Sequence, residues 1–303
     1  MISITRFFFV VLLSVLIGLL ITPLRGVMLY DKTPGVNLCS LLGFTFYFLF
    51  TLFCLKKYQV CLSSTSIFIA VLLGASIFQL PLRIINFEGT LISLPDYILH
   101  LLGIVLGYFS YKQSLTIKCC VFSIGFGLCV FMYFKGYNMW LHKINFNTFT
   151  GIVEENSPEY NLTFQTNTGD TLSLSDFKGK YLLLDCWYTY CGVCYKEMPK
   201  MQQLYGNYKQ NPEVAIYAMH CFMKETRRND LPENYATGSK ILEKKDFNYP
   251  CLSIDKDDPV LKKLGVYVYP TVLIFDKQNN LIFRGSIENA ENLIKKLLKE
   301  RGK

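Results

Sequence analysis

Charged side chains are scarce in the first 135 residues of this 303-residue chain. That stretch holds nine of the 31 Lys and Arg residues and three of the 23 Asp and Glu residues. The formal net charge of +8 therefore comes mostly from short segments between uncharged, apolar runs. This distribution is typical of membrane topology signals and speaks against a nucleic-acid-binding surface, so we expect no nucleic-acid partner.

The apolar runs predict a membrane domain over residues 1–135 with about five transmembrane helices. A weaker candidate, residues 94–111, is interrupted by Asp96 and His100, which lie four residues apart on one helical face. This pair is either a functional intramembrane pair or a pair at the water interface. The first run is long for a signal peptide and lacks a small-x-small cleavage site. Four runs are stronger: residues 7–24, 36–55, 65–85 and 117–135.

Basic residues between the runs predict the orientation of the chain. With five spans, the positive-inside rule places the C-terminal domain outside the cytoplasm. With four spans, that domain would share a side with the N-terminus. We therefore expect an integral protein of the cell inner membrane with its C-terminal domain on the periplasmic side. The residues that would face the cytoplasm are Arg6, Lys56, Lys57, Lys112 and Lys118.

The segment 181–199 organises the rest of the chain. Its apolar run Tyr181–Leu184 predicts a buried strand, and the residues after Cys194 have helical periodicity. Cys191 and Cys194 therefore form a C-x-x-C motif at a strand-to-helix junction. Free N–H groups and the helix dipole stabilise a thiolate there, which predicts Cys191 as the nucleophile and Cys194 as the resolving thiol.

These residues resemble the TlpA/ResA-type membrane-anchored thiol-disulfide oxidoreductases of the thioredoxin superfamily. The resemblance rests on Asp185–Cys194, on Glu197-Met198-Pro199 and on Tyr269-Pro270-Thr271, and it covers roughly residues 158–300. The polar composition after residue 135 predicts a linker at 136–157, and the resemblance implies a thioredoxin-like α/β three-layer sandwich at 158–303. The expected fold class is thus an α-helical membrane domain joined to this sandwich.

The resemblance also implies roles for individual residues. Asp185 would take the proton from Cys194, and Pro270 would be cis, with the Tyr269 backbone facing the disulfide. Glu197 matches an acid that relatives carry near the active site, or it is a first-turn glutamate favoured by the helix dipole. Trp187 and Tyr190 either shape the substrate surface, together with Tyr269, or serve in packing.

The expected function is reduction of disulfides in extracytoplasmic proteins, with those protein thiols as partners and a membrane electron donor as a further one. No cofactor and no metal is expected, because a zinc site would need two ligands beyond the C-x-x-C. Three alternatives remain: a dithiol oxidase, since Gly192-Val193 leaves the redox direction open; an electron-relay transporter using the six cysteines of the apolar half; and a non-catalytic binding module. A peroxiredoxin-like peroxidase is disfavoured, because Tyr188 stands where such enzymes need threonine.

Cys221 and Cys251 lie in or after predicted strands outside the motif. In an oxidising compartment they form either a second disulfide or two buried thiols, and the sequence leaves both outcomes open.

Overall fold

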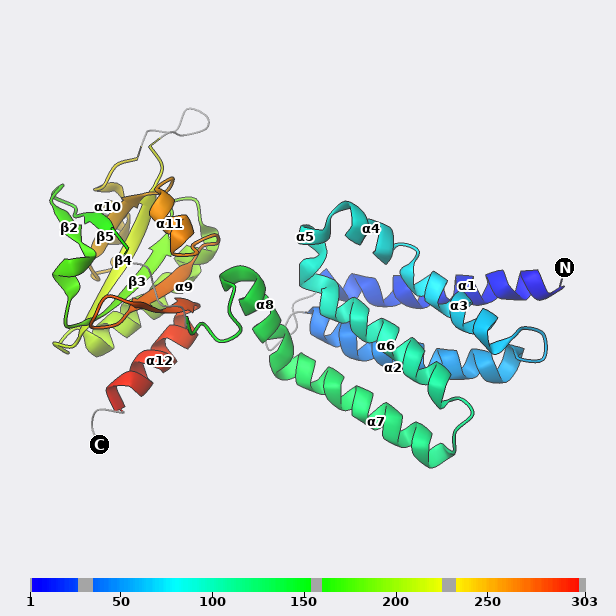
Figure 1. Cartoon of the computed structure of the whole chain (residues 1–303). Helices are drawn as coiled ribbons and strands as arrows, with labels where there is room; N and C mark the ends of the chain where they lie inside the picture. Colours follow the sequence, from blue (N-terminus) through cyan, green and yellow to red (C-terminus); the bar gives the residue numbers. More distant parts are fainter. Residues whose placement is uncertain (1, 27–34, 154–159, 225–232, 300–303) are drawn as a thin grey trace. The chain divides into compact units, whose positions relative to one another are not determined.

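The computed structural model describes residues 2–26, 35–153, 160–224 and 233–299 (Figure 1). The chain divides into two compact units, Met1–Leu141 and His142–Lys303, and each is described by itself. The boundary falls inside a helix, α8 (Tyr137–Phe146). Residues 137–146, predicted as linker, are therefore helical, with Trp140 Nε1 donating to the Leu91 carbonyl at 2.9 Å. Residues 154–157 of that predicted linker lie outside the described part.

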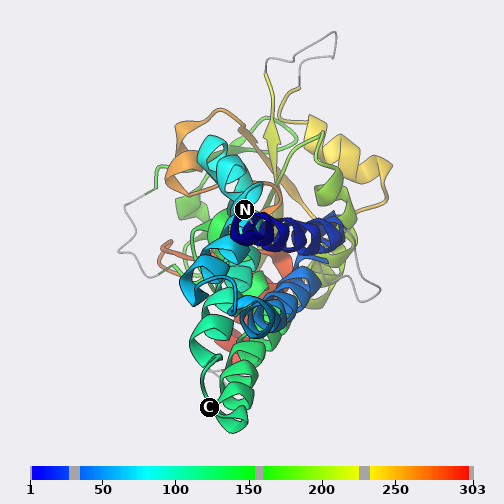
Figure 2. The same ribbon diagram turned by 90° about the vertical axis from the view of Figure 1, so that its right-hand side faces the viewer.

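The first unit consists of helices throughout its described residues. In Figure 2 α1 is seen nearly end-on, and it packs against α2 and α3. The elements are α1 (Ile2–Ile21), η1 (Thr22–Gly26), α2 (Gly35–Tyr58), α3 (Ser64–Ser76), α4 (Gln79–Ile85), α5 (Phe87–Thr90), η2 (Leu91–Ser93), α6 (Leu94–Ser110), α7 (Leu115–Phe131), the π-helical turn η3 (Met132–Gly136) and the start of α8.

Four helical segments of the described residues are long and apolar enough to cross a membrane: Ser3–Arg25, Asn37–Tyr58, Phe87–Ser110 and Leu115–Phe146. The number becomes five if the bent pair α3 and α4 is one span, with 52° between its two helices. The predicted span 65–85 is therefore bent between α3 and α4. The weaker candidate 94–111 overlaps the candidate span Phe87–Ser110. Pro81 lies in the first turn of α4, where its missing N–H is tolerated although it could not continue the ladder of α3.

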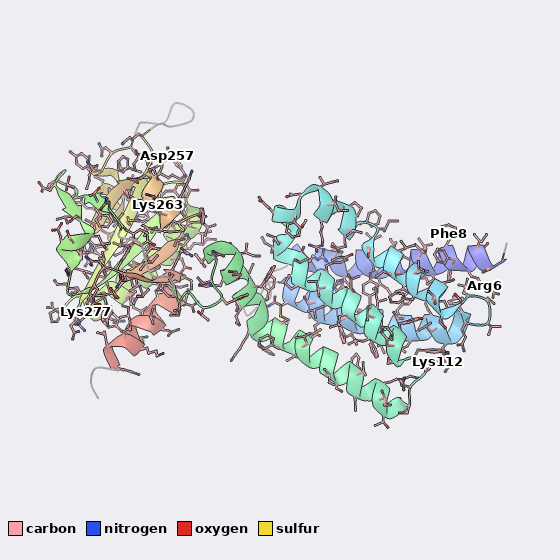
Figure 3. All side chains as sticks on the ribbon, in the orientation of Figure 1. Arg6, Phe8, Lys112, Asp257, Lys263 and Lys277 are labelled. Carbon is pink, nitrogen blue, oxygen red and sulfur yellow. A yellow bond between two sulfur atoms is a disulfide. The ribbon has the colours of Figure 1, made fainter. Side chains whose placement is uncertain are left out.

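The helical unit has two distinct ends. Arg6 and Lys112 lie at the same end (Figure 3), and the Arg6 guanidinium donates to Cys61 in the loop between α2 and α3. Arg25 and Arg83, both bonded to Gln79, lie at the other end. The chain thus runs from one end to the other along α3 and α4.

Asp96 is fully buried in this unit and carries an ion-pair cluster. Arg25 Nε donates to its Oδ2 at 2.6 Å, and His100 Nε2 lies 2.8 Å from its Oδ1. A Cβ on Gly43 would stand 1.8 Å from His100 Nε2, so only glycine allows α2 to approach α6 this closely. The predicted pair of Asp96 and His100 is therefore part of a three-member polar cluster in which the buried Asp96 carboxylate also pairs with Arg25.

The second unit is built around a seven-stranded sheet in the order β2-β1-β5-β4-β3-β6-β7. Strands β3, β4 and β5 are parallel. Strand β6 pairs antiparallel to β3, and β7 pairs antiparallel to β6. The elements are β1 (Thr163–Gln165), β2 (Thr171–Ser173), η4 (Leu174–Phe177), β3 (Tyr181–Trp187), α9 (Gly192–Tyr208), β4 (Val214–Phe222), α10 (Thr237–Lys244), β5 (Cys251–Asp255), α11 (Pro259–Lys263), β6 (Thr271–Phe275), β7 (Leu281–Gly285) and α12 (Ile287–Lys299).

Helices cover both faces of this sheet (Figure 1). Met198, Met201 and Ile294 bring α9 and α12 onto one face, where α10 also packs. On the other face the core contains residues of α11 and η4 and of the β1–β2 hairpin. The three layers confirm the predicted thioredoxin-like sandwich, because a sheet that is apolar on both faces must be covered on both.

We predict that Asp96→Ala destabilises the helical unit by about 3–5 kcal/mol, because it leaves the partly buried Arg25 guanidinium without its counter-charge and removes a polar partner of buried His100. The full chain in detergent micelles would be heated while alkylation of buried Cys54 is followed. Glu88→Ala, which changes an exposed acid of the same unit, is the control. It should leave the midpoint temperature of Cys54 alkylation unchanged. Equal midpoints for Asp96→Ala and the unsubstituted chain would contradict the role of the cluster.

Candidate active site

The C-x-x-C motif lies between the fully buried strand β3 and helix α9. Cys191 is the N-cap residue of α9, and its Sγ accepts the backbone N–H of Cys194 at 3.1 Å. The two cysteines form a disulfide with a Cα–Cα distance of 5.2 Å. In the reduced protein the same N–H and the helix dipole would stabilise a Cys191 thiolate.

Asp185 is buried in β3, six residues before Cys191. Burial raises the pKa of its carboxyl to about 7, and the nearby charge of Glu197 adds to the effect. A carboxyl that titrates near neutral pH can accept a proton and return it. The structure therefore gives Asp185 an environment suited to proton transfer.

Glu197 lies on α9 in an ion-pair group with Lys200 and Glu288. Lys200 Nζ donates to Glu197 at 2.9 Å and also to Glu288 of α12. These hydrogen bonds, first the one to Glu288 and then those to Glu197, raise the pKa of Lys200. Glu197 lies beyond the first turn of α9, so the alternative of a first-turn glutamate favoured by the helix dipole is wrong. Through Lys200 it is tied to a second helix, α12.

The Tyr269–Pro270 peptide bond is cis, as the resemblance implied. The loop that holds it borders a cavity of about 370 Å³, which Asp185 and Glu197 also line, together with Val193. Both candidate carboxyls and the cis-proline loop therefore meet at one depression beside α9.

The three aromatic residues differ in exposure. Trp187 is 1% exposed and packs against Tyr195 and His220, so the prediction that it shapes the substrate surface is wrong and the packing alternative holds. Tyr190 is 52% exposed. Tyr269 is half-buried, with its ring 5.1 Å from that of Tyr188.

Two further cysteines are free thiols on opposite faces of the sheet. Cys221 pairs in register with Ile254, so Cys251, three residues earlier on β5, points to the other face. Burial raises the pKa of each thiol to about 12. Of the two outcomes that the sequence left open, the structure shows free thiols, with Cys221 buried and Cys251 partly buried.

His220 was missed by the sequence analysis, although it touches the active-site loop. It lies in β4, and its Nε2 is 3.0 Å from Thr189 Oγ1. The available signal was a single histidine inside the apolar run 214–222, and its position has no spacing relation to the C-x-x-C.

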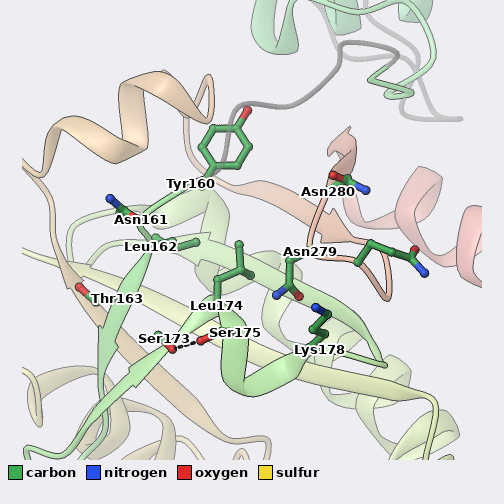
Figure 4. A pocket seen from close by; sticks show the side chains of 11 residues that line it. Tyr160, Asn161, Leu162, Thr163, Ser173, Leu174, Ser175, Lys178, Asn279 and Asn280 are labelled. Carbon is green, nitrogen blue, oxygen red and sulfur yellow. Dashed lines mark hydrogen bonds between the residues drawn. The ribbon is translucent and has the colours of Figure 1, made fainter.

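Over the described residues, one group of side chains has the spacing of metal ligands: Cys39, Asp96 and His100 of the helical unit, with ligand atoms within 4.8 Å of one another. Its Asp96 is already paired with Arg25 and His100. A larger cavity of about 590 Å³ lies beside the β1–β2 hairpin, lined by residues such as Ser175, Lys178 and Asn279 (Figure 4). None of the predicted site residues borders it.

We predict that Asp185→Asn stabilises the full chain near pH 8. A carboxyl whose pKa rises from 3.8 to about 7 on folding opposes folding above that pH, by up to about 4 kcal/mol at 1.36 kcal/mol per pKa unit. The native state of the unsubstituted chain should therefore lose stability as the pH rises from 4 to 7, and Asp185→Asn should lose less. Denaturant unfolding at several pH values measures this, with the exposed Asp170→Asn as control. Parallel pH profiles for Asp185→Asn and the unsubstituted chain would contradict the raised pKa.

The redox unit is similar in sequence to known proteins. Residues 153–284 match the AhpC/TSA family. Thiol-disulfide oxidoreductase ResA of Bacillus thuringiensis subsp. konkukian is 28% identical over 189 residues, which cover 62% of this chain and 97% of that protein. Thioredoxin-like protein YneN of Bacillus subtilis is 30% identical over 145 residues, covering 47% of this chain and 78% of YneN.

Among solved structures, a thiol:disulfide interchange protein from Bacteroides sp. is 26% identical with a TM-score of 0.37, over 48% of this chain and 88% of that protein.

ResA of Bacillus anthracis, at 30% identity, is covered over 70% of its length and 43% of this chain. The chain therefore belongs to the thioredoxin-like thiol-disulfide oxidoreductases related to ResA.

Proposed function

We propose that this chain is a membrane-anchored reductase of disulfides in extracytoplasmic proteins, with Cys191 and Cys194 as its redox couple. The observation that carries the proposal is the placement of Cys191 Sγ at the N-terminus of α9, within reach of the Cys194 N–H. Asp185 and the cis-proline loop line a depression that Val193, the residue before Cys194, also lines.

The chemistry needs two electrons and no cofactor. The Cys191 thiolate attacks one sulfur of a substrate disulfide, a mixed disulfide forms, and the first substrate thiolate leaves. Asp185 takes the proton of Cys194, and the Cys194 thiolate then attacks Cys191 Sγ. The second substrate thiolate leaves, the Cys191–Cys194 disulfide closes, and the substrate has gained two electrons.

The surface around the cis-proline loop would receive the substrate. The exposed ring of Tyr190 and the Tyr269 backbone offer an apolar contact and hydrogen bonds to an extended segment. Glu197 lies at the same depression and would adjust the local charge around the two cysteines.

The helical unit supports a periplasmic position for the redox unit at the inner membrane. Arg6 and Lys112 mark one end of the helices, which the positive-inside rule assigns to the cytoplasm. The chain crosses to the opposite end along α1, along α3 and α4, and along α7. Asn37 Nδ2, near Arg25, donates to the Tyr133 carbonyl after α7 at 2.8 Å, so the chain leaves the helices at that end.

A reductase in that position needs electrons from a membrane donor. Buried cysteines of the helical unit, such as Cys54 and Cys129, are single thiols in the described residues, which favours a separate donor over an internal relay. An oxidase is the second candidate, because the dipeptide Gly192-Val193 between the two cysteines leaves the redox direction open.

We predict that Cys194→Ser traps substrates as mixed disulfides on Cys191, because the resolving attack is lost. The full chain carrying this substitution would be expressed in a bacterial inner membrane, and adducts would be separated on non-reducing gels. Cys191→Ser with Cys194→Ser is the matched control and should trap nothing. Adducts equal in both variants, or absent from both, would contradict the assignment of Cys191 as the nucleophile.

A further inference from the structure

His220 is a fully buried histidine directly behind the active-site loop. It pairs in register with Trp187 on the neighbouring strand, and the two rings lie 4.6 Å apart. Its Nε2 lies 3.0 Å from Thr189 Oγ1. Burial lowers the pKa of His220 to about 4, so the imidazole is neutral near pH 7 and can accept the Thr189 hydroxyl proton.

The imidazole is fixed by its surroundings. A Cβ on Gly238 would lie 2.5 Å from the His220 Cβ, so α10 packs tightly against this residue. Glu233 Oε2 accepts the Met223 N–H at 2.9 Å and lies 3.9 Å from His220 Nε2. The ring therefore has little freedom to turn away from Thr189.

This arrangement has a cost in hydrogen bonding. His220 Nδ1, Glu233 Oε1 and Trp187 Nε1 are buried without a hydrogen-bond partner among the described residues. Buried polar atoms are paired in most proteins, and each unpaired one disfavours folding. An apolar side chain in β4 would avoid this cost, so packing alone does not account for a histidine here.

Thr189 is held from two directions. Its hydroxyl bonds to His220 of β4, and its carbonyl accepts the Tyr195 hydroxyl of α9 at 2.8 Å. Thr189 precedes Cys191 by two residues, and Cys191 N–H donates to the Tyr188 carbonyl at 3.1 Å. The His220–Thr189 hydrogen bond thus fixes the short loop that delivers Cys191 to the start of α9.

We propose that His220 is a positioning residue for Cys191: through Thr189 it holds the loop so that Cys191 Sγ accepts the Cys194 N–H and the thiolate is stabilised. The inference deepens the proposed function and rests on its thiol-disulfide chemistry. A stabilised thiolate favours the reduced protein over the disulfide. Loss of the hydrogen bond therefore raises the pKa of Cys191 and makes the couple more reducing.

The test uses matched substitutions in the full chain in detergent. Thr189→Val removes the hydroxyl at nearly constant volume, and Thr189→Ser keeps it. His220→Phe removes the acceptor, and His220→Gln retains a polar group near the Nε2 position. Thr163→Val, at an exposed position of β1, is the control for removal of a hydroxyl elsewhere.

Two quantities report on the loop. The pH dependence of Cys191 alkylation in the reduced protein, read by mass spectrometry, gives the pKa of that thiol. Equilibration with glutathione buffers gives the redox equilibrium constant. We expect Thr189→Val and His220→Phe each to lower the thiolate fraction and to shift the redox equilibrium by about threefold. Thr189→Ser, His220→Gln and Thr163→Val should stay close to the unsubstituted chain.

The double variant Thr189→Val with His220→Phe should shift both quantities no further than either single change, because both remove one hydrogen bond. Additive shifts would overturn the inference, as would folded variants with an unchanged Cys191 pKa and lower stability alone. Should His220→Phe fail to fold, Thr189→Val against Thr189→Ser decides the question by itself. Failure of the proposed function has a different signature: the unsubstituted chain would then show no reversible couple at Cys191 and Cys194.

Discussion

The hydrogen bond from the Cys194 N–H to Cys191 Sγ is the interaction on which the functional account depends. It places the nucleophilic sulfur where the orphan N–H groups of a helix start are available, which is where an anion is stabilised. The buried strand β3 fixes the chain before this point, and α9 fixes it afterwards. A sulfur that has to alternate between thiolate and disulfide is thereby held in one position.

The site combines this stabilised sulfur with a destabilised carboxylate. Asp185 lies in a sheet surrounded by apolar residues, and its pKa of about 7 is a consequence of lost hydration. Natural sequences tolerate such a cost at functional sites, where local rules of stability are broken for chemistry. Glu197 contributes further repulsion, but its tie to Lys200 limits where its charge can lie.

Much of this site follows from local sequence. Cys191 can be placed at a helix start without knowledge of the fold, because an apolar strand precedes the C-x-x-C and helical periodicity of apolar residues follows it. The cis bond at Pro270 followed from resemblance alone, because most X-Pro bonds are trans. The partners of Thr189 could not be predicted, since His220 reaches the loop through a strand pairing that spans about 30 residues of sequence.

Three other features of the structure could not be predicted from the sequence, each for a specific physical reason. Residues 65–85 are apolar enough for one span, but hydropathy carries no information on the bend between α3 and α4. Cys221 and Cys251 are separated by strand register, in which a shift of one residue exchanges the two faces of a sheet. The Asp96 cluster needed Arg25, whose position beside α6 depends on helix packing and not on sequence spacing.

The reduction potential of the Cys191–Cys194 couple in the full chain tests the central claim most directly. The account predicts a reversible two-electron couple with a reduction potential of about −270 mV, the value of a thioredoxin-class reductase. A potential near about −120 mV would make the protein an oxidant of folding substrates and contradict the direction proposed for it. Absence of a reversible couple would contradict the assignment of these two cysteines as a redox centre.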